Sequence, residues 1–209
     1  GTYKEPPHKI HTLEFNVESI LQKITAREKF RDVSFFRHDE PPRQPCFGKR
    51  DLDLTDEIKS SLERQKLTLQ RLYIHQSEAI GNILDGRRVV LPTSTASGKT
   101  LCFNIPVLDS IIRNSKSCAF YIYPTRALAQ DQIRKIAAFR DNYPHEEQLY
   151  TSGSYFTMTV GGKKIVFGKY EGPTSTNDRA RIREFCNIVL TNPDMLHFGI
   201  LNWNWKWTE

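Results

Sequence analysis

The sequence predicts an α/β fold, with a parallel β-sheet between two layers of helices. Two observations support this prediction. From Arg88 onward, short apolar runs alternate with segments of helical spacing, which is typical of parallel strands joined by crossover helices. Residues 93–100 read T-S-T-A-S-G-K-T and lie between an apolar run and a helical segment. A strand, a loop of small residues ending in Gly-Lys-Thr and a helix form the layout of a phosphate-binding P-loop.

The second half of the chain shows the clearest periodic patterns of apolar residues. We expect strands at residues 89–91, 119–123, 163–167 and 188–191, and helices at residues 101–113, 126–140 and 177–185. Residues 141–162 show no clear periodicity and include Gly153 and a Gly-Gly pair, so they are expected to form an insertion or a mobile hairpin. The insertion is assigned to residues 141–168.

The first half of the chain has fewer recognisable patterns. They are helical spacing at residues 15–30, a proline-rich connector at 41–45, and helices at 55–65 and 76–84, the last ending at an Asp-Gly pair. Thr55 is the expected N-cap of its helix, with Ile58 and Leu62 on one face. These patterns predict a mostly helical N-terminal extension, residues 1–50, before an incomplete nucleotide-binding domain at residues 51–209.

Composition limits the classes of protein to consider. No apolar run approaches the ~18 residues of a membrane span and no signal-peptide core is visible, so we expect an intracellular protein without a membrane partner. The formal net charge of +6 permits a polyanionic partner without demanding one. The four cysteines contain no C-x-x-C, which disfavours a zinc site or a disulfide framework. Cys118 and Cys186 are expected to be small core residues.

The P-loop predicts ATP-like ligands, a nucleoside triphosphate with Mg²⁺. Backbone N–H groups and the N-terminus of the following helix face the phosphates, and small side chains allow a close approach. The expected nucleotide-binding residues of the loop are Thr95, Ala96, Ser97, Gly98, Lys99 and Thr100. Lys99 is expected to reach the β- and γ-phosphates and the Thr100 hydroxyl to bind Mg²⁺, so these two are the predicted catalytic residues. The alternative is an ordinary strand-to-helix turn with an exposed lysine.

The segment L-Y-I-H-Q at residues 72–76 resembles the Q motif of superfamily 2 helicases, the DEAD/DEAH-box-like group. The resemblance implies a three-layer RecA-like domain in which Gln76 recognises adenine. A glutamine amide can donate to N7 and accept from N6 of adenine at the same time. Tyr73 is expected either near the base or in the core. The P-loop departs from the helicase form A-x-T-G-S-G-K-T at Thr93 and Ala96, which affects nucleotide affinity rather than a catalytic group.

Residues 123–132, Y-P-T-R-A-L-A-Q-D-Q, resemble motif Ia of the same helicases. In that group the strand-to-helix corner grips the nucleic-acid backbone. The resemblance implies that Thr125, Arg126 and Gln130 take part, and a hydroxyl, a guanidinium and free helix N–H groups are suitable phosphate partners. The alternative is a helix start with a solvated arginine.

Residues 170–183 and 190–197 resemble the Y-x-G-x-T…R…I-R and T-N-P-D-M-L-H motifs of a helicase sub-branch. This sub-branch contains MrfA-like bacterial and RecQ-like eukaryotic DNA-repair helicases and is also represented in phage defence. The motifs imply contacts with DNA at Gly172, Arg179 and Thr191. Arg179 and the arginine one helical turn later are either DNA contacts or part of a solvated face.

The leading interpretation is the N-terminal ATP-binding portion of an ATP-dependent DNA helicase or translocase in DNA repair or genome defence. Its expected partners are DNA with a single-stranded part and a second RecA-like domain. No D-E-x-D or D-E-x-H box, which supplies the catalytic carboxylates of this group, occurs in the chain, so the chain alone is expected to lack ATPase activity. The alternative is a non-catalytic, nucleotide-dependent nucleic-acid-binding subunit. A small-molecule P-loop kinase is disfavoured, because the later motifs serve no kinase role.

Overall fold

A computed structural model describes residue 26 and residues 45–92, 97–142 and 154–207. Residues 1–44 form one compact unit of the chain and residues 45–209 a second, and only the second is described below. The helix expected at residues 15–30 and the mostly helical character of the extension lie outside the described residues. Residues 46–50, assigned to the extension from the sequence, belong to the second unit. Gly48 donates its backbone N–H to the Leu72 carbonyl over 2.8 Å, and Arg50 forms ion pairs with Glu78 and Asp85.

From α4 onward, the second unit alternates helices with strands, as the sequence predicts. Its helices are α2 (Asp56–Arg64), α3 (Ile74–Leu84), α4 (Lys99–Arg113), α5 (Arg126–Ala137), α6 (Thr176–Phe185) and α7 (Pro193–Met195), with short 3-10 or π segments η2 (Leu69–Arg71), η3 (Leu196–Ile200) and η4 (Leu201–Trp207). Its strands are β1 (Ala119–Ile122), β2 (Tyr155–Val160), β3 (Lys163–Lys169) and β4 (Ile188–Thr191). The predicted elements downstream of residue 97 are all present, with bounds that shift by up to three residues.

The four strands form one sheet in the order β1-β4-β3-β2. β4 lies between β1 and β3 and is parallel to both, so that Ile188 faces Ala119 on one side and Phe167 on the other. β2 is antiparallel to β3, and the turn between them is Gly161-Gly162, both with positive φ. Such a pair of left-handed residues matches the twist of a two-residue hairpin. The sheet is therefore mixed, and only its β1-β4-β3 part is parallel as predicted.

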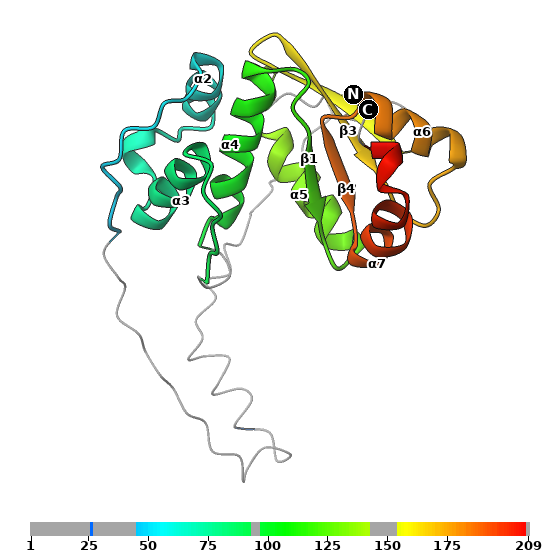
Figure 1. Cartoon of the computed structure of the whole chain (residues 1–209). Helices are drawn as coiled ribbons and strands as arrows, with labels where there is room; N and C mark the ends of the chain where they lie inside the picture. The colour runs from blue at the N-terminus through cyan, green and yellow to red at the C-terminus, as the bar shows by residue number, and fades with distance from the viewer. Residues whose placement is uncertain (1–25, 27–44, 93–96, 143–153, 208–209) are drawn as a thin grey trace, which may run out of the picture. The chain divides into compact units, whose positions relative to one another are not determined.

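Alternate side chains of the strands face two separate helical layers. In β4, Ile188 and Leu190 belong to the large core under α2, α3, α4 and α5, whereas Val189 belongs to a smaller cluster under α6 and η3. Figure 1 shows the same arrangement, with α4 and α5 on one side of β1 and β4, and α6 and the C-terminal helices on the other. All four residues of β4 are buried, as expected of a parallel strand that is covered on both faces. The predicted three-layer architecture is therefore present.

The hairpin of β2 and β3 belongs to the core, although the sequence suggested an insertion. Phe156, Met158 and Val160 of β2 are buried in the large core. Asp141 holds the turn, because its carboxylate accepts the N–H groups of Gly161 at 2.6 Å and Gly162 at 2.9 Å. The observed hairpin covers residues 155–169, and residues 143–153 of the expected insertion lie outside the described residues, so the insertion stays a prediction.

The strand predicted at residues 89–91 is absent, and this prediction was wrong. Residues 87–92 have no regular structure, and Val90 is 87% exposed. A β-strand needs a hydrogen-bonded neighbour, and among the described residues none pairs with this segment. An apolar run was therefore insufficient evidence for a strand at this position.

The helix predicted at residues 55–65 is confirmed as α2, with Ile58 and Leu62 buried on one face. Thr55 is its N-cap by position, but its hydroxyl makes no capping bond. The N–H of Thr55 instead donates to Asp109 of α4 over 2.7 Å. Asp109 is 1% exposed and also accepts from Arg113 over 2.7 Å, so this carboxylate joins α2 to α4.

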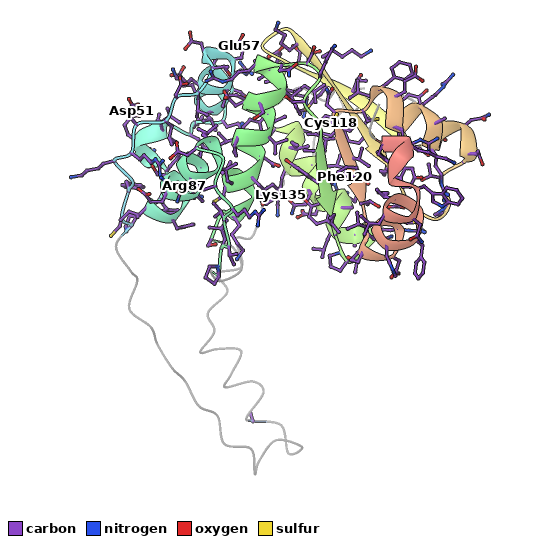
Figure 2. All side chains as sticks on the ribbon, viewed as in Figure 1. Asp51, Glu57, Arg87, Cys118, Phe120 and Lys135 are labelled. Atoms are coloured by element: carbon purple, nitrogen blue, oxygen red, sulfur yellow. The ribbon has the colours of Figure 1, made fainter. Side chains whose placement is uncertain are left out.

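Cysteine burial differs from the prediction at one position. Cys186 is buried as expected, but Cys118 is exposed at the turn before β1 (Figure 2). All four described cysteines are free thiols, and none of the described helices is long and apolar enough to cross a membrane. Burial, and then the nearby Cys118, raises the pKa of the Cys186 thiol to about 12, and burial also raises the pKa of Cys102.

Alkylation should therefore divide the cysteines into two classes. Because the thiolate is the reacting species, Cys102 and Cys186 are expected to resist iodoacetamide in the folded protein at mildly alkaline pH, whereas the exposed Cys46 and Cys118 react. Peptide mass spectrometry after timed labelling measures this. Denaturant should make all four react, and rapid labelling of Cys186 without denaturant would show that its burial is wrong.

Candidate nucleotide and nucleic-acid sites

The described part of the P-loop contains a glycine that no other residue can easily replace. Gly98 has φ +75°, in the left-handed region, and immediately precedes α4. A Cβ atom at this position would collide with Nε2 of Gln76. Lys99 and Thr100 are the first two residues of α4, where backbone N–H groups lack helical partners and suit phosphate oxygens. Thr95 and Ala96 lie outside the described residues.

The N-terminus of α3 holds this loop through two side chains. Gln76 is 4% exposed and donates Nε2–H to the Gly98 carbonyl over 3.1 Å, while its Oε1 accepts the Tyr73 N–H at 2.9 Å. Nε2 of His75 lies 2.8 Å from the Ser97 carbonyl oxygen, and it must carry a proton to form this bond because a carbonyl only accepts. Both carbonyl oxygens thus bond to α3. Ser97 and Gly98 are therefore held against the N-terminus of α3.

This geometry adds a positioning role to Gln76 and leaves its adenine contact a prediction. One amide hydrogen and one lone pair of Gln76 are used within the protein, and one of each remains. His75 was not identified from the sequence, where its only distinction is that it precedes Gln76. Its bond to Ser97 and the bond of Gln76 to Gly98 each join residues that are 22 positions apart, so two adjacent residues of α3 contact two adjacent residues of the loop.

Three aromatic rings lie next to Gln76. Phe47 and Tyr73 are nearly parallel, with centroids 5.9 Å apart and 6° between their planes, and Tyr73 and His75 follow at 5.8 Å and 14°. Phe47 is 41% exposed and Tyr73 is 42% exposed. Tyr73 therefore lies at the surface beside Gln76, which favours the predicted position near a base over a core position. Nothing in the sequence singled out Phe47, because its place depends on a β-bridge to Tyr73.

A hollow of about 760 Å³ opens beside the P-loop between α4 and α5. Gly98, Lys99 and Thr100 line one end, whereas Tyr123 and Leu128 are among the apolar residues of the other. Burial, and then the charge of Asp131, raises the pKa of Tyr123 to about 12, so its hydroxyl stays protonated at neutral pH. Gly98, Lys99 and Thr100 contribute backbone N–H groups and an ammonium group, which suit phosphate oxygens.

The predicted nucleic-acid contacts lie at one edge of the sheet. β1, β3 and β4 are parallel, so the segments that follow them, residues 123–126, 170–172 and 191–192, meet at their carboxyl ends. Ligands of open α/β sheets bind at this edge. Arg126, which is 67% exposed, forms a 3.2 Å ion pair with Glu171. The structure thereby brings motif Ia and the Y-x-G-x-T segment together.

Arg179 and Thr125 fix the backbone at this edge. Arg179 donates to the carbonyls of Glu171 at 3.2 Å and Gly172 at 3.1 Å, which brings two of the predicted DNA contacts, Arg179 and Gly172, to one loop. Gly172 is exposed, with open space where a side chain would lie. The Thr125 hydroxyl caps α5 by accepting the Leu128 N–H. These bonds determine the shape of the edge, and contact with DNA stays a prediction for each residue.

Thr191 and Gln130 are less accessible than the sequence suggested. Thr191 is 3% exposed, and its hydroxyl donates to the Tyr170 carbonyl over 2.9 Å. In this structure it anchors the loop after β3, so a direct phosphate contact would need Thr191 to become exposed. Gln130 lies one turn into α5 and is half-buried. The predicted turn at Asn192 is present, because its side chain caps α7 by accepting the Met195 N–H at 2.8 Å.

Comparison with known sequences places these motifs in one family. The family described as DEAD/DEAH box helicase matches residues 73–209. YprA of Bacillus subtilis, an uncharacterized ATP-dependent helicase, is 35% identical over 172 residues, which cover 82% of this chain and 20% of that protein. The ATP-dependent helicase hrq1 of Schizosaccharomyces pombe is 30% identical over 194 residues, covering 92% of this chain and 17% of that protein. The chain thus spans about a fifth of the length of these relatives.

Solved structures support the same relationship. The crystal structure of the DUF1998 helicase MrfA bound to DNA and AMPPNP aligns with a TM-score of 0.65 at 31% identity, covering 91% of this chain and 23% of that one. A DEAD box protein from the hyperthermophile Methanococcus jannaschii aligns with a TM-score of 0.54 at 20% identity, over 77% of this chain and 40% of that one, and shows the fold alone. The predicted helicase resemblance and the partial RecA-like fold are confirmed.

Proposed function

The chain belongs to the DEAD/DEAH box helicase family, and we propose that it is the N-terminal ATP-binding part of an ATP-dependent DNA helicase or translocase. The proposed setting is DNA repair or genome defence inside the cell. The observation that carries the proposal is the attachment of α3 to the P-loop. His75 and Gln76 bond to the carbonyls of Ser97 and Gly98, so the predicted adenine-reading residue lies against the last residues of the predicted phosphate loop.

Within this site, each residue has a role that follows from its position. The N–H groups at the start of α4 would donate hydrogen bonds to the phosphate oxygens, and the Lys99 ammonium would lie beside them in the hollow. The Thr100 hydroxyl suits Mg²⁺, which keeps several waters and takes few protein ligands when phosphates are present. Mg²⁺, when bound, would neutralise the charge of the phosphates. Gln76 and Tyr73 would hold the base.

The proposed DNA path crosses the carboxyl edge of β1, β4 and β3. Arg126 and the N-terminus of α5 supply positive charge there, and Arg179 holds the loop of Glu171 and Gly172 in place. Backbone contacts of this kind fix position without reading sequence, as a translocating enzyme requires. A second RecA-like domain is the proposed partner that would close over the nucleotide.

Loss of the Lys99 ammonium should weaken nucleotide binding and so remove the effect of the nucleotide on DNA affinity. In the full-length protein we expect an AMPPNP–Mg²⁺ complex to change the affinity for single-stranded DNA, and Lys99→Ala to weaken nucleotide binding by about tenfold or more, because a hydrogen bond to a charged group contributes ~1.5–3 kcal/mol. Fluorescence anisotropy of a labelled oligonucleotide and nucleotide titration measure the two effects. Lys116→Ala is the matched control, since Lys116 is exposed just beyond the other end of α4. If AMPPNP and Mg²⁺ did not change the affinity of the unmutated protein for DNA, the proposal would be refuted.

A further inference from the structure

A second hollow, of about 230 Å³, lies between α6 and the C-terminal helices η3 and η4. Its described lining combines exposed aromatic rings with cations and includes no aspartate or glutamate. The residues that matter here are Tyr170, Arg179, Arg183, Phe198, Trp203 and Lys206. None of the described members belongs to the P-loop or to motif Ia. The combination selects a ligand that is both anionic and aromatic.

The rings divide into a packed floor and an exposed rim. Trp207 packs against Tyr170 and against Phe120 of β1, with both centroid distances 5.2 Å. Figure 2 labels Phe120 on this strand. Phe198 and Trp203 are 64% and 50% exposed, so much of their apolar surface faces water. Phe198 lies in the π-helical segment η3, an irregularity that often occurs at functional positions.

The cations are arranged around these rings. Lys206 Nζ lies 4.6 Å from the centre of the Trp203 ring, and the Arg179 guanidinium lies 5.3 Å from the centre of the Tyr170 ring. Arg183 is one helical turn from Arg179 on α6 and lines the same hollow. An aromatic surface that is bordered by positive charge is the usual platform for a stacked base with its phosphate.

The hollow continues the proposed DNA-binding edge. Arg179 lines the hollow and also bonds to the carbonyls of Glu171 and Gly172, and Glu171 is paired with Arg126. A DNA strand bound at Arg126 would therefore reach the hollow by passing over the loop that contains Glu171. No separate ligand path is required.

We propose that this hollow binds one unstacked base of single-stranded DNA, with the adjacent phosphates against Arg183 and Lys206. The inference rests on the proposed function and adds a base-binding subsite to it. The volume is below the ~300–1,000 Å³ of sites for drug-sized ligands, which suits a single ring system. Stacking on Trp203 or Phe198 uses the π-face that every base has, so the subsite is independent of sequence.

The test compares two probes with equal charge and different bases. One is a single-stranded oligo(dT), and the other has the same length and phosphates but abasic sites in place of thymines. The unmutated full-length protein should prefer oligo(dT). Trp203→Ala should reduce its affinity for oligo(dT) by about 5- to 150-fold, the range for one stacked base, and leave the abasic probe unaffected. Trp203→Phe should keep most of the preference because a ring remains.

Phe185→Ala provides a matched control, because Phe185 is a 60% exposed ring on α6 that lines a different hollow. It should leave both affinities unchanged. Phe198→Ala is a second test variant if Trp203→Ala does not fold. Equal affinity of the unmutated protein for the two probes would overturn the subsite while leaving the proposed DNA binding intact. If the unmutated protein bound neither probe at low salt, both the subsite and the proposed DNA binding would be overturned. If Trp203→Ala lowered the affinity for both probes equally, the base contact would be overturned.

Discussion

Replacing Phe156 with alanine is expected to lower the free energy of unfolding by about 3–5 kcal/mol. Phe156 and Phe167 are fully buried and stacked, with ring centroids 4.6 Å apart and 5° between the planes. The truncation removes a buried ring and leaves a cavity in the large core, which the paired strands β2 and β3 prevent from closing. Because domains are stable by only ~5–15 kcal/mol, this is a substantial fraction of the total.

Denaturant titration followed by circular dichroism measures the effect as a lower midpoint with an unchanged slope. Thr159→Ala is the control, since Thr159 lies on the same strand with an exposed side chain and should cost only a few tenths of a kcal/mol. If Phe156→Ala were as mild as Thr159→Ala, residues 155–169 would be a peripheral hairpin, and the three-layer core described above would be incorrect.

The parallel part of the sheet could be predicted because its strands are covered on both faces. Such strands are continuous apolar runs, and Ile188–Thr191 is buried at every position. β2 alternates in burial instead, with Phe156, Met158 and Val160 inward. Its alternation was overlooked beside the poorly patterned residues that precede it. The Gly161-Gly162 pair, which contributed to that interpretation, forms the tight turn of the hairpin.

At residues 89–91 the error is the reverse, because a strand was predicted and none is present. Val90 is exposed because strand formation depends on a hydrogen-bonded neighbour and not only on apolar side chains. Cys118 was misplaced for a related reason, since it lies one residue before β1 rather than within it. Local composition identifies the type of element more reliably than its pairing or its limits.

The residues of the candidate site that belong to short sequence motifs could be predicted. The motif order placed Gln76 near the P-loop, and the structure joins them through the Gly98 carbonyl. The contacts of His75 and Phe47 depend on distances between segments far apart in the chain, so no local pattern contains them. Thr191 shows the limit of transferring a motif, because its hydroxyl is buried against Tyr170 in this structure.

Replacing Gly98 with alanine is expected to remove most nucleotide binding, a loss of about tenfold or more. The left-handed φ of +75° costs a non-glycine residue roughly 1–2 kcal/mol, and the added Cβ would also collide with the Gln76 amide. The collision breaks the bond from Gln76 to the Gly98 carbonyl and displaces the start of α4. The N–H groups that face the phosphates then lose their arrangement.

Gly86→Ala separates the two causes, because Gly86 has φ +76° but no atom within 4 Å of the position its Cβ would occupy. It should show the backbone strain as a lower melting temperature and leave nucleotide affinity unchanged, as measured by titration with a fluorescent ATP analogue and Mg²⁺. Gly98→Ala should lower the melting temperature at least as much and lose the affinity as well. If both variants bound nucleotide equally well, the contact between α3 and the P-loop would not shape the phosphate site, because only Gly98→Ala disturbs that contact.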